Sequence, residues 1–150
     1  GRTHMDIFNN NPLICAALAW VSAQLMKFII VNIRERRINL LVLIQSGGMP
    51  SSHSATVCSL ATAIGFQVGF GSPEFAIAAI LAFIVMYDAA GVRRAAGEQA
   101  RRINILTQDY LSDFGEDMQA QLKELLGHTP PEVFGGAILG ILIPTILYNY

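Results

Sequence analysis

The sequence predicts an all-α fold: an integral-membrane helical bundle with about four spanning helices, a short re-entrant or interfacial segment and a cytoplasmic amphipathic helix. The first observation is composition, because 53% of the 150 residues are hydrophobic and only 14% are charged, against roughly a quarter charged in a typical soluble domain. The second observation is that the chain has four apolar stretches, and the third is that its cations fall on one side of the predicted membrane. The length indicates a single helical membrane domain over residues 5–150, and residues 1–4 resemble the remnant of an expression tag.

Four apolar stretches are candidates for spanning helices, which need about 20 residues, within a range of about 17–25. The first is interrupted by Gln24 and Lys27, and the third is short unless its flanking residues extend it. The second and fourth are rich in small residues, which allow close helix contacts inside membranes. In chain order the stretches are residues 12–31, 54–70, 75–87 and 133–148.

Two further segments do not have the pattern of spanning helices. Residues 38–44 are apolar but too few to cross a bilayer, so we expect them to lie at the interface or to dip back into it. Residues 95–129 are polar, but four apolar residues within them share one helical face. This face predicts an amphipathic helix that packs on the bundle or on the lipid surface. Its residues are Met118, Leu122, Leu125 and Leu126.

The cations indicate how the chain is oriented. If the N-terminus is outside and four helices are threaded, the nine cations after Met5 fall at or near one side, and the outer turn at residues 71–74 has none. The positive-inside rule makes that side cytoplasmic. We therefore expect a multi-pass protein of the cell (inner) membrane whose candidate site faces the cytoplasm. The nine cations are Lys27, Arg34, Arg36, Arg37, Arg93, Arg94, Arg101, Arg102 and Lys123.

The segment at residues 47–55, GGMPSSHSA, has the layout of an anion site. Its glycines and proline break the backbone, and Ser51, Ser52 and Ser54 can then cap the helix that follows. The first N–H groups of a helix have no intrahelical partner, and the helix dipole adds a partial positive charge there. His53 places a proton donor or acceptor in the same turn. An ordinary loop with a serine N-cap and a surface histidine fits the nonapeptide equally well.

Lys27 and Arg34 are seven residues apart, so two helical turns place them on one face. Snorkelling of both cations toward lipid phosphates would explain the pair without a binding site. Lys27 is the more informative residue, because an ionisable group inside an apolar stretch is costly and marks a candidate functional site.

His128 and Glu132 precede the fourth apolar stretch. A carboxylate four residues after the histidine could accept its Nδ1 proton, fix the tautomer and leave Nε2 as nucleophile or base. The alternative is a loop histidine, with Glu132 complementing the N-terminus of the next helix.

A dense cluster of charges follows the third apolar stretch. Arg93 or Arg94 could clamp a phosphate through two hydrogen bonds, whereas a basic cluster that only fixes orientation in the membrane would also explain the pair. We expect Asp88 to pair with one of these arginines, and Glu98 could do so as well. The sequence has no ligand spacing for a metal, and its net charge of −1 does not suggest a nucleic-acid partner.

Taken in order, these pieces resemble the type-2 phosphatidic acid phosphatase superfamily, which is related to acid phosphatases and vanadium-dependent haloperoxidases. With GGMPSSHSA, DAAGVRRAAGEQ and LLGHTPPEVFGG, the chain after Met5 is similar to its small divergent bacterial and plant branch. The first motif is Lys, six residues, Arg-Pro, and here Lys27 and Arg34 keep the spacing with Glu35 in place of proline. The second motif, Pro-Ser-Gly-His, reads Pro-Ser-Ser-His at residues 50–53.

The third motif of the superfamily is Ser-Arg, five residues, His, three residues, Asp, and this chain keeps only part of it. His128 and Glu132 keep the last spacing, with glutamate for aspartate. Gln121 and Leu122 occupy the places of Ser-Arg. Our hypothesis is that Arg93 or Arg94 supplies the missing arginine from another point in the chain.

The resemblance implies a membrane phosphatase that hydrolyses a lipid phosphate or pyrophosphate without a metal or other cofactor, and that vanadate inhibits as a phosphate mimic. His128 would attack phosphorus and form a phosphohistidine, oriented by Glu132, and His53 would protonate the leaving alcohol. The phosphoryl oxygens would be held by Lys27, Arg34, Ser51 and backbone N–H groups near Ser52.

Two other functions fit the same sequence. One is a non-catalytic membrane protein that binds an anionic lipid head group or phosphate in the same pocket. The other is a small transporter or assembly subunit that forms a homo-oligomer, in which Gly135, Gly136 and Gly140 would mediate the contacts between copies.

Overall fold

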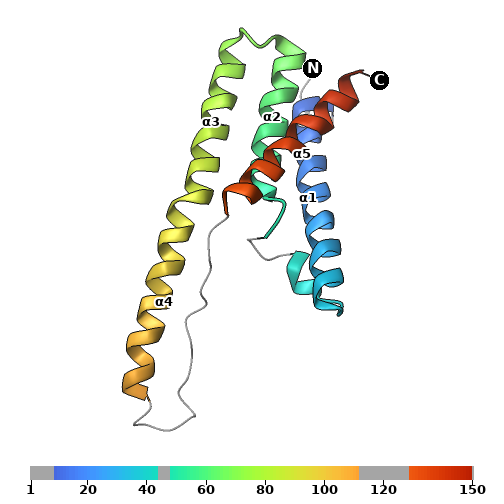
Figure 1. The fold of residues 1–150 in the computed structure, drawn as a ribbon. Coiled ribbons are helices and arrows are strands. Elements are labelled where there is room, and N and C mark those ends of the chain that lie inside the picture. Colours follow the sequence, from blue (N-terminus) through green and yellow to red (C-terminus); the bar gives the residue numbers. More distant parts are fainter. Residues whose placement is uncertain (1–8, 44–47, 112–128, 150) are drawn as a thin grey trace, which may run out of the picture.

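The chain forms a bundle of helices in a computed structural model that describes residues 9–43, 48–111 and 129–149 (Figure 1). All regular secondary structure in these described ranges is helical, as the sequence predicts. The α-helices are α1 (Asn11–Glu35), α2 (Ser52–Val68), α3 (Pro73–Ala90), α4 (Val92–Leu111) and α5 (Pro130–Asn149), and η2 (Leu40–Leu43) is a short 3-10 helix.

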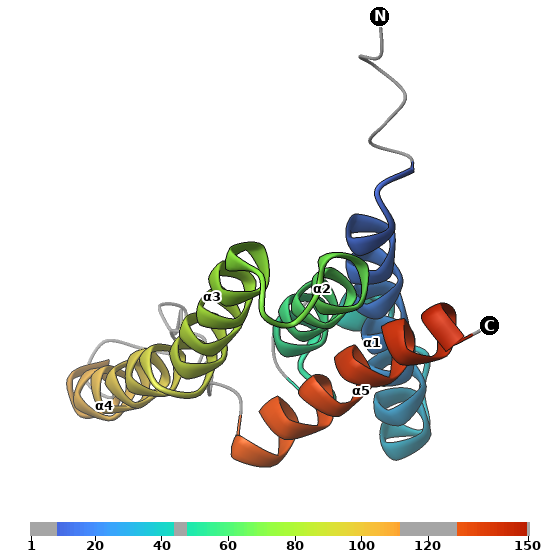
Figure 2. The ribbon, with the colours of Figure 1, turned by 90° about the horizontal axis from the view of Figure 1, so that it is seen from above.

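Helix α2 lies at the centre of the bundle. It packs against α1, α3 and α5, and the view from above shows it between α3 and α1, with α5 crossing both α2 and α1 (Figure 2). The start of α1 and the end of α5 lie at one end of the bundle, and the start of α2 lies toward the other (Figure 1). We call these the terminal end and the GGMPSSHSA end.

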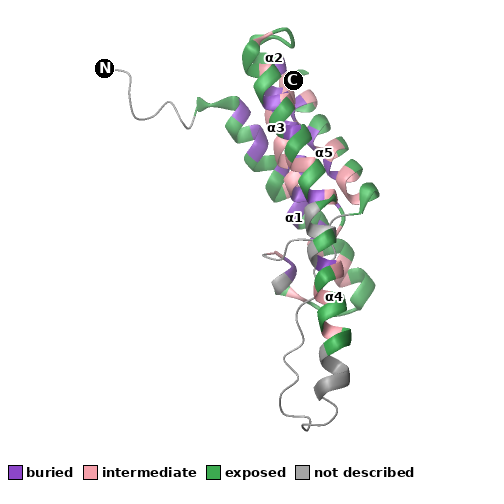
Figure 3. Ribbon diagram, turned by 90° about the vertical axis from the view of Figure 1, so that its left-hand side faces the viewer, coloured by how far each residue is buried: buried purple, intermediate pink, exposed green. Residues whose placement is uncertain are grey.

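The surface of the bundle carries large apolar side chains, whereas its interior is built mostly from small ones. Ala19, Ala23 and Ala55 form the buried core, whereas Ile77 is 72% exposed and Phe83 is 64% exposed on α3. Exposed ribbon accordingly covers the outside of the helices, and buried residues face inward (Figure 3). Small residues inside and large apolar residues outside are typical of helices that face lipid. The chain is therefore a helical membrane protein.

Three helices, α1, α3 and α5, are long and apolar enough to cross a membrane. The third apolar stretch, short in sequence, is extended at both ends into the 18-residue helix α3. Helix α2 has 17 residues and many small polar side chains, and a fourth span formed by it stays a prediction.

The contact between α2 and α5 depends on two glycines spaced four residues apart. A Cβ atom added at Gly136 would collide with the carbonyl oxygen of Ser51, and one added at Gly140 would collide with that of Ala55. Close backbone approach of this kind requires small residues. Gly136 and Gly140 are therefore engaged within one chain, and not on a free face for contacts between copies.

The described part of the apolar segment, residues 38–43, folds back against α1. Its 3-10 helix η2 is held there by two side chains of α1: Asn32 Oδ1 accepts a hydrogen bond of 2.9 Å from the Asn39 N–H, and Gln24 Nε2 donates one of 2.9 Å to the Leu43 carbonyl oxygen. We refer to residues 39–43 as the strap. The expectation of a short non-spanning segment is confirmed, and its depth relative to a membrane stays a prediction.

Helix α4 continues α3 beyond the bundle (Figure 1). Gly91 has a right-handed φ of −95°, and helical hydrogen bonds pass through it, from the Gly91 N–H to the Tyr87 oxygen at 2.8 Å and from the Ala95 N–H to the Gly91 oxygen at 3.0 Å. The charged cluster thus lies on a helix, a feature that its sequence pattern does not predict. The predicted amphipathic face at residues 118–126 lies outside the described residues.

Candidate functional site

The GGMPSSHSA loop ends at the N-terminus of α2, where Ser51 is the N-cap. Its Oγ accepts hydrogen bonds from the Ser54 N–H at 3.3 Å and from the Ser54 hydroxyl at 3.2 Å. Both serines are fully buried. The capping prediction is therefore confirmed for Ser51, whereas Ser52 and Ser54 lie within the helix.

The start of α5 lies directly beside this loop. The Ser51 N–H donates a hydrogen bond of 3.0 Å to the carbonyl oxygen of Glu132, and a Cβ atom added at Gly135 would lie 3.2 Å from Met49 Cε. Ser51 of the second motif and Glu132 of the third are 81 residues apart in sequence, and the described parts of the two motifs meet at this point.

Lys27 reaches the same place from α1, with 1% of the residue exposed. A Cβ atom added at Gly48 would lie 3.7 Å from Lys27 Cγ and 3.8 Å from its Cδ, so the lysine stem runs alongside the loop. Gly48 has a φ of +84°, a left-handed value that favours glycine. The expectation that Lys27 lies near GGMPSSHSA is confirmed.

The Lys27 ammonium is buried, and its Nζ has no hydrogen-bond partner among the residues that the structure describes. The carboxylate of Glu132 interacts with it electrostatically. A buried cation needs hydrogen-bonding partners as well as a counter-charge. The position is therefore chemically suited to the oxygens of an anion.

His53 follows in the first turn of α2 and is half-buried, with its Nδ1 shielded from solvent. Ser52 beside it is almost fully buried. First-turn N–H groups have no carbonyl partner within their own helix, so this turn can present backbone donors to a ligand. The arrangement joins a cation, a hydroxyl group, backbone donors and an imidazole in one region.

Glu132 forms the capping arrangement that the sequence left open as an alternative. Its Oε2 accepts a hydrogen bond of 3.0 Å from the Thr129 N–H at the start of α5, as the glutamate of a capping box does. His128, the predicted nucleophile, lies outside the described residues, so an orienting role for Glu132 stays a prediction.

The structure does not place the side chains of the predicted arginines in the buried region around Lys27. Arg34 is exposed in the last turn of α1, about 10 Å along the helix axis from Lys27, so the structure does not bring it into the buried region. Arg93 and Arg94 lie in the first turn of α4, and their side chains are outside the described part of the chain.

The two carboxylates that were predicted to pair with these arginines, Asp88 and Glu98, have different surroundings. Asp88 is exposed in the last turn of α3, and its predicted pairing with Arg93 or Arg94 is untested for the same reason. Glu98 pairs along the exposed surface of α4 with Arg101 and Arg102, each at 3.5 Å, and its predicted pairing with Arg93 or Arg94 stays a prediction. Within the described ranges, no three His, Cys, Asp or Glu side chains gather as metal ligands.

Gln24 is a further polar residue of this region, and it was not predicted to belong to the site. Only 7% of it is exposed, and it lies three residues before Lys27 on the same side of α1. Its Oε1 is buried and has no hydrogen-bond partner within the described ranges. A second polar residue one turn from Lys27, inside an apolar stretch, was the signal that could have identified it.

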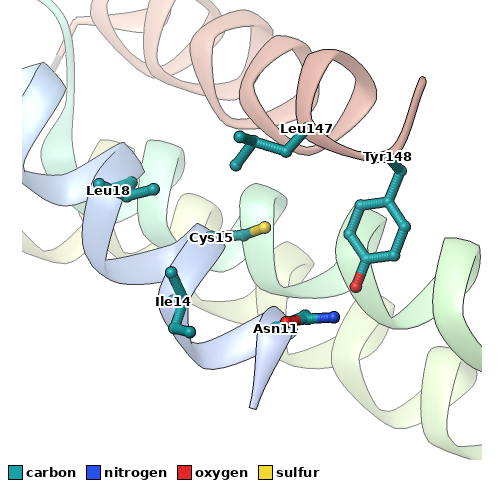
Figure 4. Close-up of a pocket in the computed structure, with 6 residues that line it drawn as sticks. All are labelled: Asn11, Ile14, Cys15, Leu18, Leu147 and Tyr148. Atoms are coloured by element: carbon teal, nitrogen blue, oxygen red, sulfur yellow. The ribbon is translucent and has the colours of Figure 1, made fainter. Parts of the chain in front are cut away.

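Two cavities lie at the terminal end, away from these residues. One, of about 270 Å³, lies between the start of α1 and the end of α5 and is lined by Cys15 and Tyr148 among others (Figure 4). The other, of about 310 Å³, lies between α1, α2 and the start of α3. Neither cavity includes a predicted site residue.

The chain is similar to known proteins over nearly its whole length. A family model described as "Divergent PAP2 family" matches residues 8–143. An "Uncharacterized membrane protein YuiD" of Bacillus subtilis (strain 168) is 43% identical over 153 residues, which cover 95% of this chain and 97% of that protein. No solved structure matches the chain.

Proposed function

Because the chain belongs to the divergent PAP2 family, we propose that it is a membrane phosphatase that hydrolyses a lipid phosphate or pyrophosphate at the GGMPSSHSA end of the bundle. The observation that carries the proposal is the buried Lys27, whose stem lies beside Gly48 and whose ammonium has no hydrogen-bond partner within the described ranges. A phosphoryl group would supply the acceptor oxygens that this cation needs.

In this proposal, the reaction runs through a covalent phosphohistidine. Nε2 of His128 attacks phosphorus, the bond from phosphorus to the leaving oxygen breaks, and His53 donates a proton to that oxygen. Water then attacks the phosphohistidine, gives up a proton to His53 and releases inorganic phosphate. Glu132 orients His128. Phosphoryl transfer depends mainly on positioning and on stabilising the charge of the transferred group.

The oxygens of the transferred group are held by several donors. Lys27, the Ser51 hydroxyl group and the first-turn N–H groups near Ser52 supply those at the loop. Arg34, exposed at the end of α1, would contact the group from outside the buried region, and either Arg93 or Arg94, supported by Asp88, takes the place of the missing motif arginine. No metal or cofactor takes part. The site faces the cytoplasm of the cell (inner) membrane, in keeping with the distribution of cations.

The experiment is a phosphate-release assay on purified protein in detergent micelles that contain a phosphatidate or an isoprenyl pyrophosphate, with a metal chelator present. We expect release that vanadate inhibits and that His128→Ala abolishes. His53→Ala should slow release most for poor leaving groups, because these need a proton most. Gln67→Ala, at the terminal end, is the control and should retain activity. Full activity of His128→Ala would refute the proposal.

A second candidate is a non-catalytic protein that binds an anionic lipid head group at the same place. Two observations favour it: Glu132 Oε2 is engaged in capping the Thr129 N–H, and Gln121 and Leu122 replace the Ser-Arg pair. For this candidate, the parent protein shows no turnover, and lipid binding survives His128→Asn.

A further inference from the structure

Two buried polar atoms of opposite hydrogen-bonding type lie on neighbouring turns of α1. Lys27 Nζ can only donate, whereas Gln24 Oε1 can only accept. Each is shielded from solvent, and neither has a hydrogen-bond partner in the described ranges. A ligand that satisfies both atoms must therefore carry an acceptor and a donor on the same group.

The strap fixes which end of the Gln24 amide is left for a ligand. The carbonyl oxygen of Leu43 can only accept, so the atom at 2.9 Å from it must be Nε2, and Oε1 is then the other amide atom. Residues three apart on a helix have Cβ atoms about 5–6 Å from one another. The Gln24 and Lys27 side chains therefore leave α1 from neighbouring positions on one face, as the binding of one small tetrahedral anion by both would require.

We propose that Gln24 is a specificity-determining residue, which accepts a hydrogen bond from the P–OH of a singly protonated phosphoryl group whose anionic oxygens bind Lys27. This inference rests on the proposed function only in taking the ligand to be a phosphoryl anion. The chemistry is that of inorganic phosphate or a phosphomonoester. Sulfate and phosphodiesters carry no such proton at neutral pH. Their oxygens would therefore face Gln24 Oε1 as one acceptor facing another, without a hydrogen bond.

The strap provides the means of separating this role from a structural one. Gln24 Nε2 and Asn32 Oδ1 both hold residues 39–43 against α1, but only Gln24 carries a buried acceptor beside Lys27. Asn32→Leu removes a strap bond and leaves that acceptor in place. Gln24→Glu removes the strap bond from Nε2 and keeps an acceptor. Gln24→Leu removes both.

The experiment is calorimetric titration of the purified protein in detergent at neutral pH with inorganic phosphate and, separately, with sulfate. We expect the wild type to prefer phosphate by about tenfold or more, since a buried acceptor left without a donor is strongly unfavourable. Gln24→Leu should bind the two anions equally, while Gln24→Glu and Asn32→Leu keep the preference for phosphate. Gel filtration identifies any variant that fails to fold.

Lipid titrations distinguish the sources of the phosphoryl group. If micellar phosphatidate displaces inorganic phosphate, the ligand of the site is a lipid phosphomonoester. If it does not, the ligand is free phosphate. Equal binding of phosphate and sulfate by the wild type, or an unchanged preference in Gln24→Leu, would overturn the inference, as would displacement by phosphatidylglycerol as effective as that by phosphatidate. Phosphate release from a lipid, measured on the same preparation, tests the proposed function independently of these ratios.

Discussion

The Ser51 N–H donates a hydrogen bond of 3.0 Å to the carbonyl oxygen of Glu132 and so joins the N-terminus of α2 to that of α5. Through this bond, the GGMPSSHSA loop and the first turn of α5 are held as one unit. Lys27 completes the unit from α1, since its stem lies against Gly48 and its charge interacts with that of Glu132.

Replacing Lys27 with methionine should separate binding from stability. A hydrogen bond to a charged group contributes about 1.5–3 kcal/mol. The free energy of phosphate binding, measured by calorimetry, should therefore become less favourable by about that amount in Lys27→Met. Thermal stability in detergent should stay the same or rise, because the substitution removes a buried charge. Arg34→Met alters an exposed cation and should weaken binding less. A large loss of thermal stability in Lys27→Met would contradict this account of the lysine.

The cap of α2 can be compared with a matched cap elsewhere. Ser51 caps α2, and Ser72 caps α3 through a 3.1 Å bond from the Phe75 N–H to its Oγ. Loss of a serine cap costs about 0.5–2 kcal/mol, so Ser51→Ala and Ser72→Ala should destabilise the protein to a similar extent in chemical denaturation. Only Ser51→Ala should also reduce phosphate binding. Equal effects of the two variants on binding would argue against a ligand at the start of α2.

The close contact of α2 and α5 should not tolerate a side chain. Gly136→Ala places a Cβ atom against the Ser51 carbonyl oxygen, and overpacking of this kind costs about 1–3 kcal/mol. Gly71→Ala is the control, because a Cβ atom added there meets nothing within 4 Å. The melting temperature of Gly136→Ala should fall clearly below that of Gly71→Ala. Similar melting temperatures would mean that α2 and α5 can move apart without a loss of stability, which would contradict the importance of this contact.

The orientation in the membrane can be tested by labelling. In a background with Cys15 and Cys58 replaced by alanine, a cysteine introduced at Ser72 should react with an impermeant maleimide added to intact cells. One introduced at Arg102 should react only after the membrane is permeabilised. Reaction at Arg102 in intact cells would place the GGMPSSHSA end outside and reverse the predicted topology.

Much of the helical framework could be predicted from local sequence. The stretches at residues 12–31, 75–87 and 133–148 each lie within a helix of the structure, α1, α3 and α5, because an apolar run favours a helix wherever water is excluded. Ser51 as a cap could be predicted for a similar reason, since capping depends on neighbouring residues alone.

The remaining features depend on contacts between distant residues. The bond between Ser51 and Glu132, and the strap bond from Gln24 to Leu43, join residues 81 and 19 positions apart. No local pattern specifies such pairs. The continuation of α3 into α4 was also missed, because a charged cluster after an apolar helix indicates the membrane boundary but not whether the helix ends there.

The central claim is that His128 becomes phosphorylated during turnover at the GGMPSSHSA end of the bundle. The most direct measurement is to quench the protein in alkali during turnover of a radiolabelled lipid phosphate, conditions under which phosphohistidine survives, and to locate the label by peptide mass spectrometry. The account predicts label on His128, and none in His128→Ala. Turnover without a labelled histidine, or label on a serine, would contradict it.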